Sequence, residues 1–211
     1  HNLQSNVIHE LYLDPADQIW LIERDEPGRN IIFIDILDPI SLTVQSLENY
    51  IREPIPFKVG DIKDMENDST NNLFILTKQN DVYRFGQNKL VHLFQIPSAK
   101  PDIVLGASTD ILVTTAPYAD SLDVWDKNGT WLSRHPTMFS EEQKRDGIFW
   151  LPAGPMADGR LLMVAKDPHG KLMYYGSIDK DGVSDIYPIV ASTNFSFGFV
   201  YDQYNKRLML N

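Results

Sequence analysis

Short apolar runs separated by polar turns recur along the whole chain. A polar corner is followed by an apolar run, a turn and another strand-like segment, and the first apolar residues after the corners are Ile19, Leu73, Ile111, Leu161 and Leu208. These residues are spaced by 54, 38, 50 and 47 positions. A repeat of about 47 residues is typical of a four-stranded propeller blade and too short for a strand, a helix and a second strand with their loops. The pattern therefore predicts an all-β, β-propeller fold.

Each interval divides into strands of ordinary length, four in a complete blade, with Pro, Gly, Asp and Asn at the turns. The predicted strands include 7–13, 41–47, 59–65, 111–115, 121–126 and 207–210. We predict a single propeller domain, or a fragment of one, over residues 1–211. The predicted blades are four complete four-stranded blades at 7–50, 58–97, 101–136 and 148–190, and a partial fifth blade at 195–211. Only six residues precede the first predicted strand at Val7, too few to complete the fifth blade. Because propellers close by hiding their sheet edges, we expect the chain to be the N-terminal part of a larger ring.

The second strand of each predicted blade is a nearly continuous apolar run, which is expected of a strand that is covered on both faces. The corner before it carries a restricted set of residue types at one position, namely Asp17, Asn71, Gly159 and Asn205. Gly, Asn and Asp tolerate the left-handed backbone region better than other residues. We therefore predict a tight corner with positive φ at this position.

One segment departs from the strand pattern. Ser140 is followed by Glu141, Glu142 and Gln143, and this order has the form of a helix capping box. The segment 137–147 therefore predicts a short surface helix between the third and fourth blades.

The corners resemble the repeat of two-component-regulator propellers, which reads Asp-x-x-Gly-x-Leu/Ile-Trp-Ile/Val-Gly-Thr. In this chain Asp or Asn stands in the place of the first Gly. The matching residues are Asp14, Asp17, Ile19 and Trp20 in the first blade, and Asp68, Asn71, Leu73, Phe74, Ile75 and Thr77 in the second. The segment 81–93 resembles the next strands of that family, whereas the segment 121–132 is closer to NHL-type propellers.

In that family the propeller is the extracytoplasmic sensory part of a membrane histidine kinase or hybrid regulator, as in Bacteroidetes histidine kinases. The resemblance thus implies a periplasmic or extracellular location and a role in signal transduction. It also implies that the repeat corners are structural rather than catalytic. The corner residues to which this applies are Asp14, Asp17, Trp20, Asp68, Asn71, Phe74, Gly159 and Asn205.

Composition excludes several classes of function. Of the 211 residues, 43% are hydrophobic, enough for a real core, and 19 basic against 29 acidic side chains give a net charge of -10. This charge argues against nucleic acid and against an anionic membrane surface as partners. The most apolar stretch, 30–37, is short and contains Asp35, so we expect no membrane contact by this domain. Without cysteine there is no disulfide, thiolate nucleophile or Cys-ligated metal.

No catalytic residue, metal site or cofactor is predicted. The segment 179–185 clusters three carboxylates, those of Asp179, Asp181 and Asp185, around Gly182. It lacks the further ligands of a calcium loop and is interpreted as a solvated hairpin turn. The histidines have no metal-binding spacing and lie at His1, His9, His92, His135 and His169.

Two classes of function remain open. The first is a non-catalytic recognition or sensory module that binds a small extracellular ligand or a protein, and the absence of catalytic motifs favours it. The alternative is a metal-centred, lactonase-like propeller hydrolase. Carboxylates of the inner strands, for example Glu10, Asp61, Asp102 and Asp202, would converge in the hydrolase and scatter in the recognition module. The sequence names no ligand-binding residue, and exposed sheet edges favour self-association.

Overall fold

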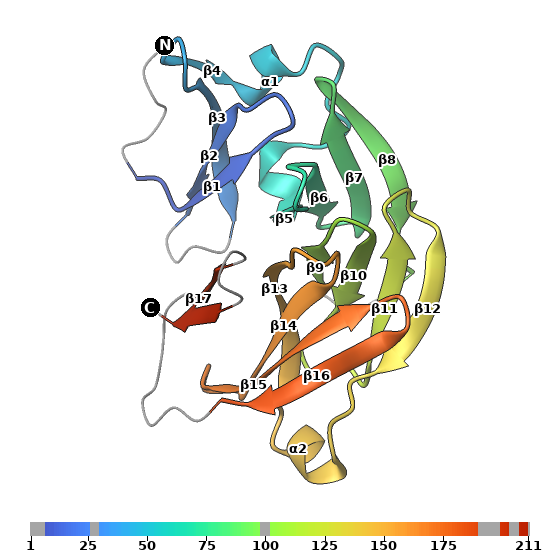
Figure 1. The fold of residues 1–211 in the computed structure, drawn as a ribbon. Coiled ribbons are helices and arrows are strands. Elements are labelled where there is room, and N and C mark those ends of the chain that lie inside the picture. The colour runs from blue at the N-terminus through green and yellow to red at the C-terminus, as the bar shows by residue number, and fades with distance from the viewer. Residues whose placement is uncertain (1–6, 26–29, 98–101, 190–198, 203–206, 211) are drawn as a thin grey trace. The chain divides into compact units, whose positions relative to one another are not determined.

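The computed structural model describes residues 7–25, 30–97, 102–189, 199–202 and 207–210. Within these residues the regular secondary structure is almost entirely antiparallel strand, with two short α-helices and one 3-10 turn (Figure 1). The chain divides into two compact units, His1–Ala99 and Lys100–Asn211.

The first unit contains two four-stranded sheets, each with its strands in sequence order. The strands of the first sheet are β1 (Glu10–Leu13), β2 (Ile19–Arg24), β3 (Ile31–Asp38) and β4 (Thr43–Ser46), and those of the second are β5 (Ile62–Asn67), β6 (Leu73–Thr77), β7 (Asp81–Gly86) and β8 (Lys89–Gln95). Helix α1 (Leu47–Tyr50) and the 3-10 turn η1 (Val59–Asp61) lie on the connection between the sheets.

The second unit repeats this organisation. One sheet contains β9 (Val104–Ala107), β10 (Ile111–Thr115), β11 (Ser121–Asp126) and β12 (Trp131–Pro136), and the other contains β13 (Phe149–Pro155), β14 (Leu161–Lys166), β15 (Leu172–Asp179) and β16 (Gly182–Pro188). Helix α2 (Glu141–Arg145) connects them. A two-stranded sheet of β17 (Phe199–Asp202) and β18 (Arg207–Leu210) follows.

These sheets confirm the predicted fold class: the protein is all-β, with four four-stranded antiparallel sheets of the propeller-blade type and the start of a fifth. The second strands β6 and β10 are buried at every position, and β14 is buried at all positions but its last. Burial on both faces is what continuous apolar runs predict. The predicted helix is also present as α2, where the Ser140 hydroxyl accepts the Gln143 N–H and the Gln143 side chain accepts the Ser140 N–H.

Each unit has its own hydrophobic core between its two sheets. In the first unit the core joins Trp20 and Ile22 of β2 to Met65 of β5 and Ile75 of β6. In the second unit Val113 and Val124 pack with Trp150 and Met163 in the same manner. Face-to-face packing of neighbouring sheets is the packing that propeller blades require.

Some predicted strands are wrong in part. The first, expected at 7–13, begins at Glu10. The strand expected at 41–47 ends at Ser46, because the chain turns into α1 at Leu47 and buries Leu47 and Tyr50 in the core of the first unit. The strand expected from Val59 begins at Ile62, after η1. The last two differences lie on the connection between the first two blades.

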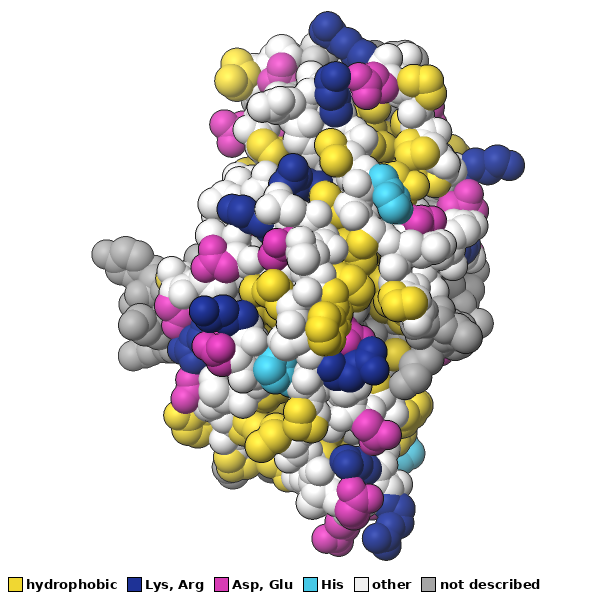
Figure 2. Space-filling model, turned by 90° about the vertical axis from the view of Figure 1, so that its right-hand side faces the viewer, with side chains coloured by type: hydrophobic (Ala, Val, Ile, Leu, Met, Phe, Trp, Pro, Cys, Tyr) yellow, Lys and Arg dark blue, Asp and Glu magenta, His cyan; other side chains and the backbone are white. Residues whose placement is uncertain are grey.

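The surface carries charges of both signs. On the face drawn in Figure 2, acidic and basic side chains are interspersed with hydrophobic ones. Among the described residues no helix is long and apolar enough to cross a membrane.

Candidate functional site

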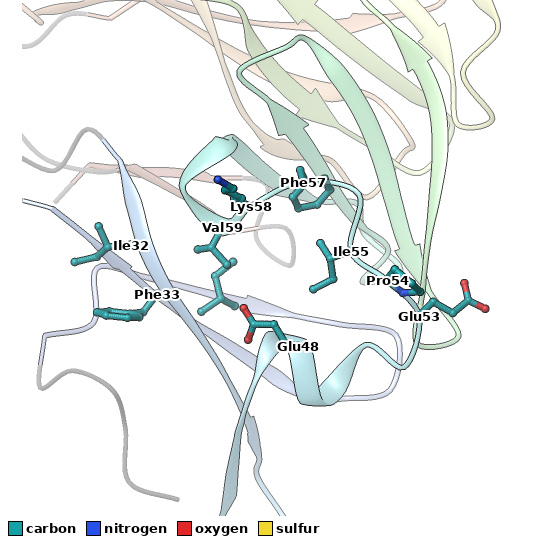
Figure 3. A pocket seen from close by; sticks show the side chains of 10 residues that line it. Ile32, Phe33, Glu48, Glu53, Pro54, Ile55, Phe57, Lys58 and Val59 are labelled. Atoms are coloured by element: carbon teal, nitrogen blue, oxygen red, sulfur yellow. The ribbon is translucent and has the colours of Figure 1, made fainter.

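The first unit has an open groove beside β3, with a volume of about 570 Å³ (Figure 3). One wall is the N-terminal half of β3, and the other is the connection that leads from α1 to η1. Its lining residues are Ile32, Phe33, Ile34, Glu48, Glu53, Pro54, Ile55, Phe57, Lys58 and Val59. The volume falls in the range of small-molecule and peptide sites.

The groove exists because the fourth strand of this blade is short. Strand β4 pairs only with Asp35–Asp38 of β3, and the chain then leaves the sheet as α1. Helix α1 is held by the buried Tyr50, whose hydroxyl donates a 2.6 Å hydrogen bond to Asp14 Oδ2. The corner of the first blade therefore positions the helix that borders the groove.

The groove combines apolar walls with a charged rim. Ile32 and Phe33 are 41% and 40% exposed, unusual values for large apolar side chains of an inner sheet position. Phe57 contacts Tyr83 edge to face at 5.0 Å between ring centroids, which fixes the opposite wall. At the rim, Glu53 forms an exposed ion pair with Lys89 at 2.7 Å. An amphipathic ligand suits this combination.

The repeat corners are hydrogen-bonded turns. Asp14 is fully buried, and its carboxylate accepts the Ala16 and Gln18 N–H groups and the indole N–H of the equally buried Trp20, at 2.8, 3.0 and 3.1 Å. Asp68 accepts N–H groups from Thr70 and Asn72 at the equivalent place.

The residues at the tip of these corners have positive φ. The values are 58° for Asp17, 62° for Asn71 and 88° for Gly159. Phe74, on the strand that follows the second corner, is fully buried. Asn205 lies outside the described residues. None of the corner residues that the structure describes lines the groove.

A second polar group lies on the inner strands of the first unit. The Glu10 carboxylate forms a bidentate ion pair with Arg24 at 2.7 and 3.0 Å, and it also accepts the Tyr12 hydroxyl at 3.0 Å. Burial and the nearby Asp64 and Glu10 carboxylates raise the pKa of Glu66. Burial and the same acidic neighbourhood raise the pKa of Tyr12. The sequence pointed to Glu10 but not to Asp64 and Glu66, whose alternation along one strand is the signal that was overlooked.

Among the described residues, the other carboxylates named from the sequence share no hydrogen bond or ion pair with the Glu10 group. Asp61 accepts the Lys58 N–H at 3.2 Å, and Asp102 lies exposed in a turn. The side chain of Asp202 lies outside the described residues. Asp179 accepts the Asp181 N–H at 2.8 Å within the hairpin turn, and Asp185 forms an ion pair with Arg160.

The described histidines contact individual neighbours. His9 accepts the Arg24 N–H, His92 contacts Asp81 at 3.0 Å, and His135 contacts Ser133 at 2.8 Å. His169 is exposed in its turn, and His1 lies outside the described residues. Among the described residues, no group of three or more His, Asp or Glu side chains has an arrangement that could hold a metal ion.

Comparison with known proteins finds similarity at the level of fold. No protein-family model matches the chain, and no curated protein sequence matches it. Among solved structures, virginiamycin B lyase from Staphylococcus aureus, a propeller protein, matches with a TM-score of 0.54 and 12% identity over 94% of this chain and 60% of that chain. A chain of Kuenenia stuttgartiensis hydrazine synthase matches with a TM-score of 0.51 and 10% identity over 90% of this chain and 53% of that one.

A chain of the mitotic checkpoint complex also matches, with a TM-score of 0.51 and 10% identity over 85% of this chain and 50% of that one. The chain thus spans between 50% and 60% of the length of these structures. Similar folds host unrelated functions, and these solved structures include both a lyase and a chain of a regulatory complex. The comparison shows that the chain has a β-propeller fold.

Proposed function

We propose that this chain is a non-catalytic recognition module that binds its ligand in the groove of the first blade. The groove itself carries this proposal: it is open, it exposes Ile32 and Phe33, and Glu48 and Lys58 are among its lining residues (Figure 3). Apolar contact area with a few polar groups is the usual composition of a binding site.

The resemblance of the corners to two-component-regulator propellers supports a sensory role. On this proposal the chain is the extracytoplasmic sensing part of a signalling protein, and its location is periplasmic or extracellular. The ligand is a small extracellular molecule or a protein, and neither nucleic acid nor membrane is a partner. Fusion of the natural gene to a phosphatase that is active only outside the cytoplasm tests the location, since an inactive fusion contradicts it.

Binding in the groove is tested with a library of small organic compounds and NMR spectra of the ¹⁵N-labelled chain. We expect saturable shifts at residues 32–34 and 53–59 for some compounds. The variant Phe33→Asp should abolish these shifts. Ile40→Asp is the matched control, because Ile40 is 93% exposed in the same unit and does not line the groove.

The control variant should respond as the unchanged protein does. Shifts that persist in Phe33→Asp, or compounds that bind only outside the groove, would show that the site is wrongly placed. Circular dichroism of both variants establishes that they are folded before they are compared.

A further inference from the structure

Methionine side chains hold the only sulfur atoms of this chain. The sequence has six Met and no Cys. Oxidation of sulfur in this protein therefore begins at a thioether and gives methionine sulfoxide, since there is no thiolate to compete for the oxidant. Which Met reacts first depends on how far each thioether is exposed to solvent.

One thioether is more exposed than the others in the part of the chain that the structure describes. Met138 is 62% exposed. The other Met side chains that are described are fully buried or half-buried, namely Met65, Met163, Met156 and Met173. The side chain of Met209 lies outside the described residues. An oxidant in solution therefore reaches the Met138 sulfur without any opening of the fold.

The backbone around Met138 fixes this exposure. The residue before it, Thr137, is buried, donates its N–H to the Asp120 carbonyl oxygen at 3.0 Å and accepts the Trp150 indole N–H on its own carbonyl oxygen at 2.8 Å. The residue after it, Phe139, is buried and stacks on Trp150 with 5.1 Å between ring centroids. Met138 joins these two held residues on the connection from β12 to α2 (Figure 1), and its side chain is left in solvent.

Packing does not explain a bulky side chain at this position. The φ of Met138 is 62°, a conformation that is unfavourable for residues other than Gly, Asn and Asp. Most of the described residues with positive φ are of those three types. A Met that is both exposed and strained gains little from burial, and such backbone outliers are a guide to function.

We infer that Met138 is a site of reversible oxidation by hydrogen peroxide. The sulfur attacks one peroxide oxygen, so that an S–O bond forms and the O–O bond breaks. The leaving hydroxide takes the proton of the transferred oxygen and departs as water, while the thioether is oxidised to the sulfoxide. A methionine sulfoxide reductase restores the thioether: two thiols are oxidised to a disulfide, and the oxygen leaves as water. This inference goes beyond the proposed recognition function and does not depend on it.

The fold tolerates the product at this position. A sulfoxide replaces an apolar group by a polar one, which destabilises a core but not a side chain that stands in water. At Met65 or Met163 the same oxygen would be buried among apolar side chains. Oxidation at Met138 thus changes the polarity of the surface while the strands stay in place.

The test treats the whole chain with hydrogen peroxide and follows each Met by peptide mass spectrometry. The tryptic peptide 135–144 contains Met138 and no other Met. We expect Met138 to be oxidised about tenfold or more faster than Met65 and Met163, because buried thioethers react only after local opening of the fold. Treatment with methionine sulfoxide reductases of both epimer specificities and dithiothreitol should then return the peptide to its original mass.

Two variants identify the reacting sulfur. Met138→Leu keeps an apolar side chain of similar size, so it should remove the fast oxidation and leave the rates at the other Met residues unchanged. Met173→Leu is the matched control in the same unit, because Met173 is half-buried and the fast reaction at Met138 should persist. The chain oxidised at Met138 alone, obtained by mild treatment, should keep the melting temperature of the unoxidised chain.

Three results would overturn the inference. Equal rates at Met138 and at Met156 or Met173 would mean that exposure does not select the site. A sulfoxide that the reductases leave unchanged in the folded chain would make the oxidation irreversible. A lower melting temperature after oxidation at Met138 alone would mean that the fold does not tolerate the product.

Discussion

Asp14 and Asp68 show how this fold uses single polar residues. Their carboxylates are almost completely buried, a costly position that proteins accept only when hydrogen bonds satisfy the oxygens. In both corners the donors are backbone N–H groups two and four residues later. The side chain thus closes the turn. The residue between the two donors, Asp17 or Asn71, adopts the left-handed backbone region.

We expect the corner residue Asn71 to respond to its backbone conformation rather than to side-chain contacts. Its φ is 62°, which glycine adopts without strain and a β-branched residue does not. Asn71→Gly should be nearly neutral, whereas Asn71→Val should reduce the free energy of unfolding by about 1 to 2 kcal/mol. Urea titration of the two variants measures the difference. Equal losses in the two variants would mean that the Asn71 side chain, and not its backbone conformation, determines the change in stability.

The raised pKa of Glu66 gives a pH dependence of stability. Burial and the carboxylates of Asp64 and Glu10 favour its protonated form in the folded protein. When the pKa of a carboxyl is higher in the folded than in the unfolded protein, the group stabilises the folded state most at a pH below the unfolded pKa. This stabilisation is lost as the pH rises through the folded pKa. Glu66→Gln should therefore raise the melting temperature at neutral pH and have little effect near pH 4, below the ordinary value of 4.5. A lower melting temperature of the variant at neutral pH would contradict this.

At the scale of elements, the strands were predictable because their apolar runs and polar corners are local in the sequence. The predicted bounds of β10, β11 and β18 agree with the structure at both ends. The short β4 was not predictable, since the segment 41–47 has a strand-like alternation and Leu47 packs only after the chain has left the sheet. The groove was missed for the same reason: the exposure of Ile32 and Phe33 depends on where another strand stops, which their own sequence does not encode.

The close approach of β9 and β13 in the second unit gives a prediction for glycine. A Cβ on Gly106 would lie 2.5 Å from Pro152 Cβ and 2.7 Å from Leu161 Cδ2, too close without a shift of either strand. Gly106→Ala should lower the free energy of unfolding by about 1 to 3 kcal/mol. Gly86→Ala is the matched control, because its Cβ would meet nothing within 4 Å. Denaturant titration should find this control near neutral, and similar losses in both variants would refute the packing argument.

At the scale of the whole molecule, the two compact units hold separate described core clusters. Repeat proteins gain much of their stability from contacts between neighbouring repeats. A substitution in one core therefore destabilises the neighbouring repeats more than distant ones. This property distinguishes a propeller from a domain with one central core, in which a single core substitution loosens all elements together.

We expect Trp20→Ala to act mainly on the first unit. Trp20 is fully buried, contacts Phe85 at 4.9 Å between ring centroids and donates to Asp14, so its removal should cost about 3 to 5 kcal/mol. Hydrogen exchange followed by mass spectrometry should show a larger loss of protection in residues 30–97 than in residues 102–189. A uniform loss would show that the two units unfold as one.

The Asp14 and Asp68 corners differ in the sequence distance over which their carboxylates find hydrogen-bond donors. Among the residues that the structure describes, the Asp68 carboxylate accepts hydrogen bonds from Thr70 and Asn72 alone, whereas the Asp14 carboxylate also accepts from Trp20 and, 36 residues later, from Tyr50. For protein engineering, the hairpin around Asp68 is thus a portable part that carries its own donors into another scaffold. The hairpin around Asp14 is not portable in this sense. If it is transplanted without α1, the buried carboxylate loses the Tyr50 hydroxyl, and a replacement donor must be designed in the new host.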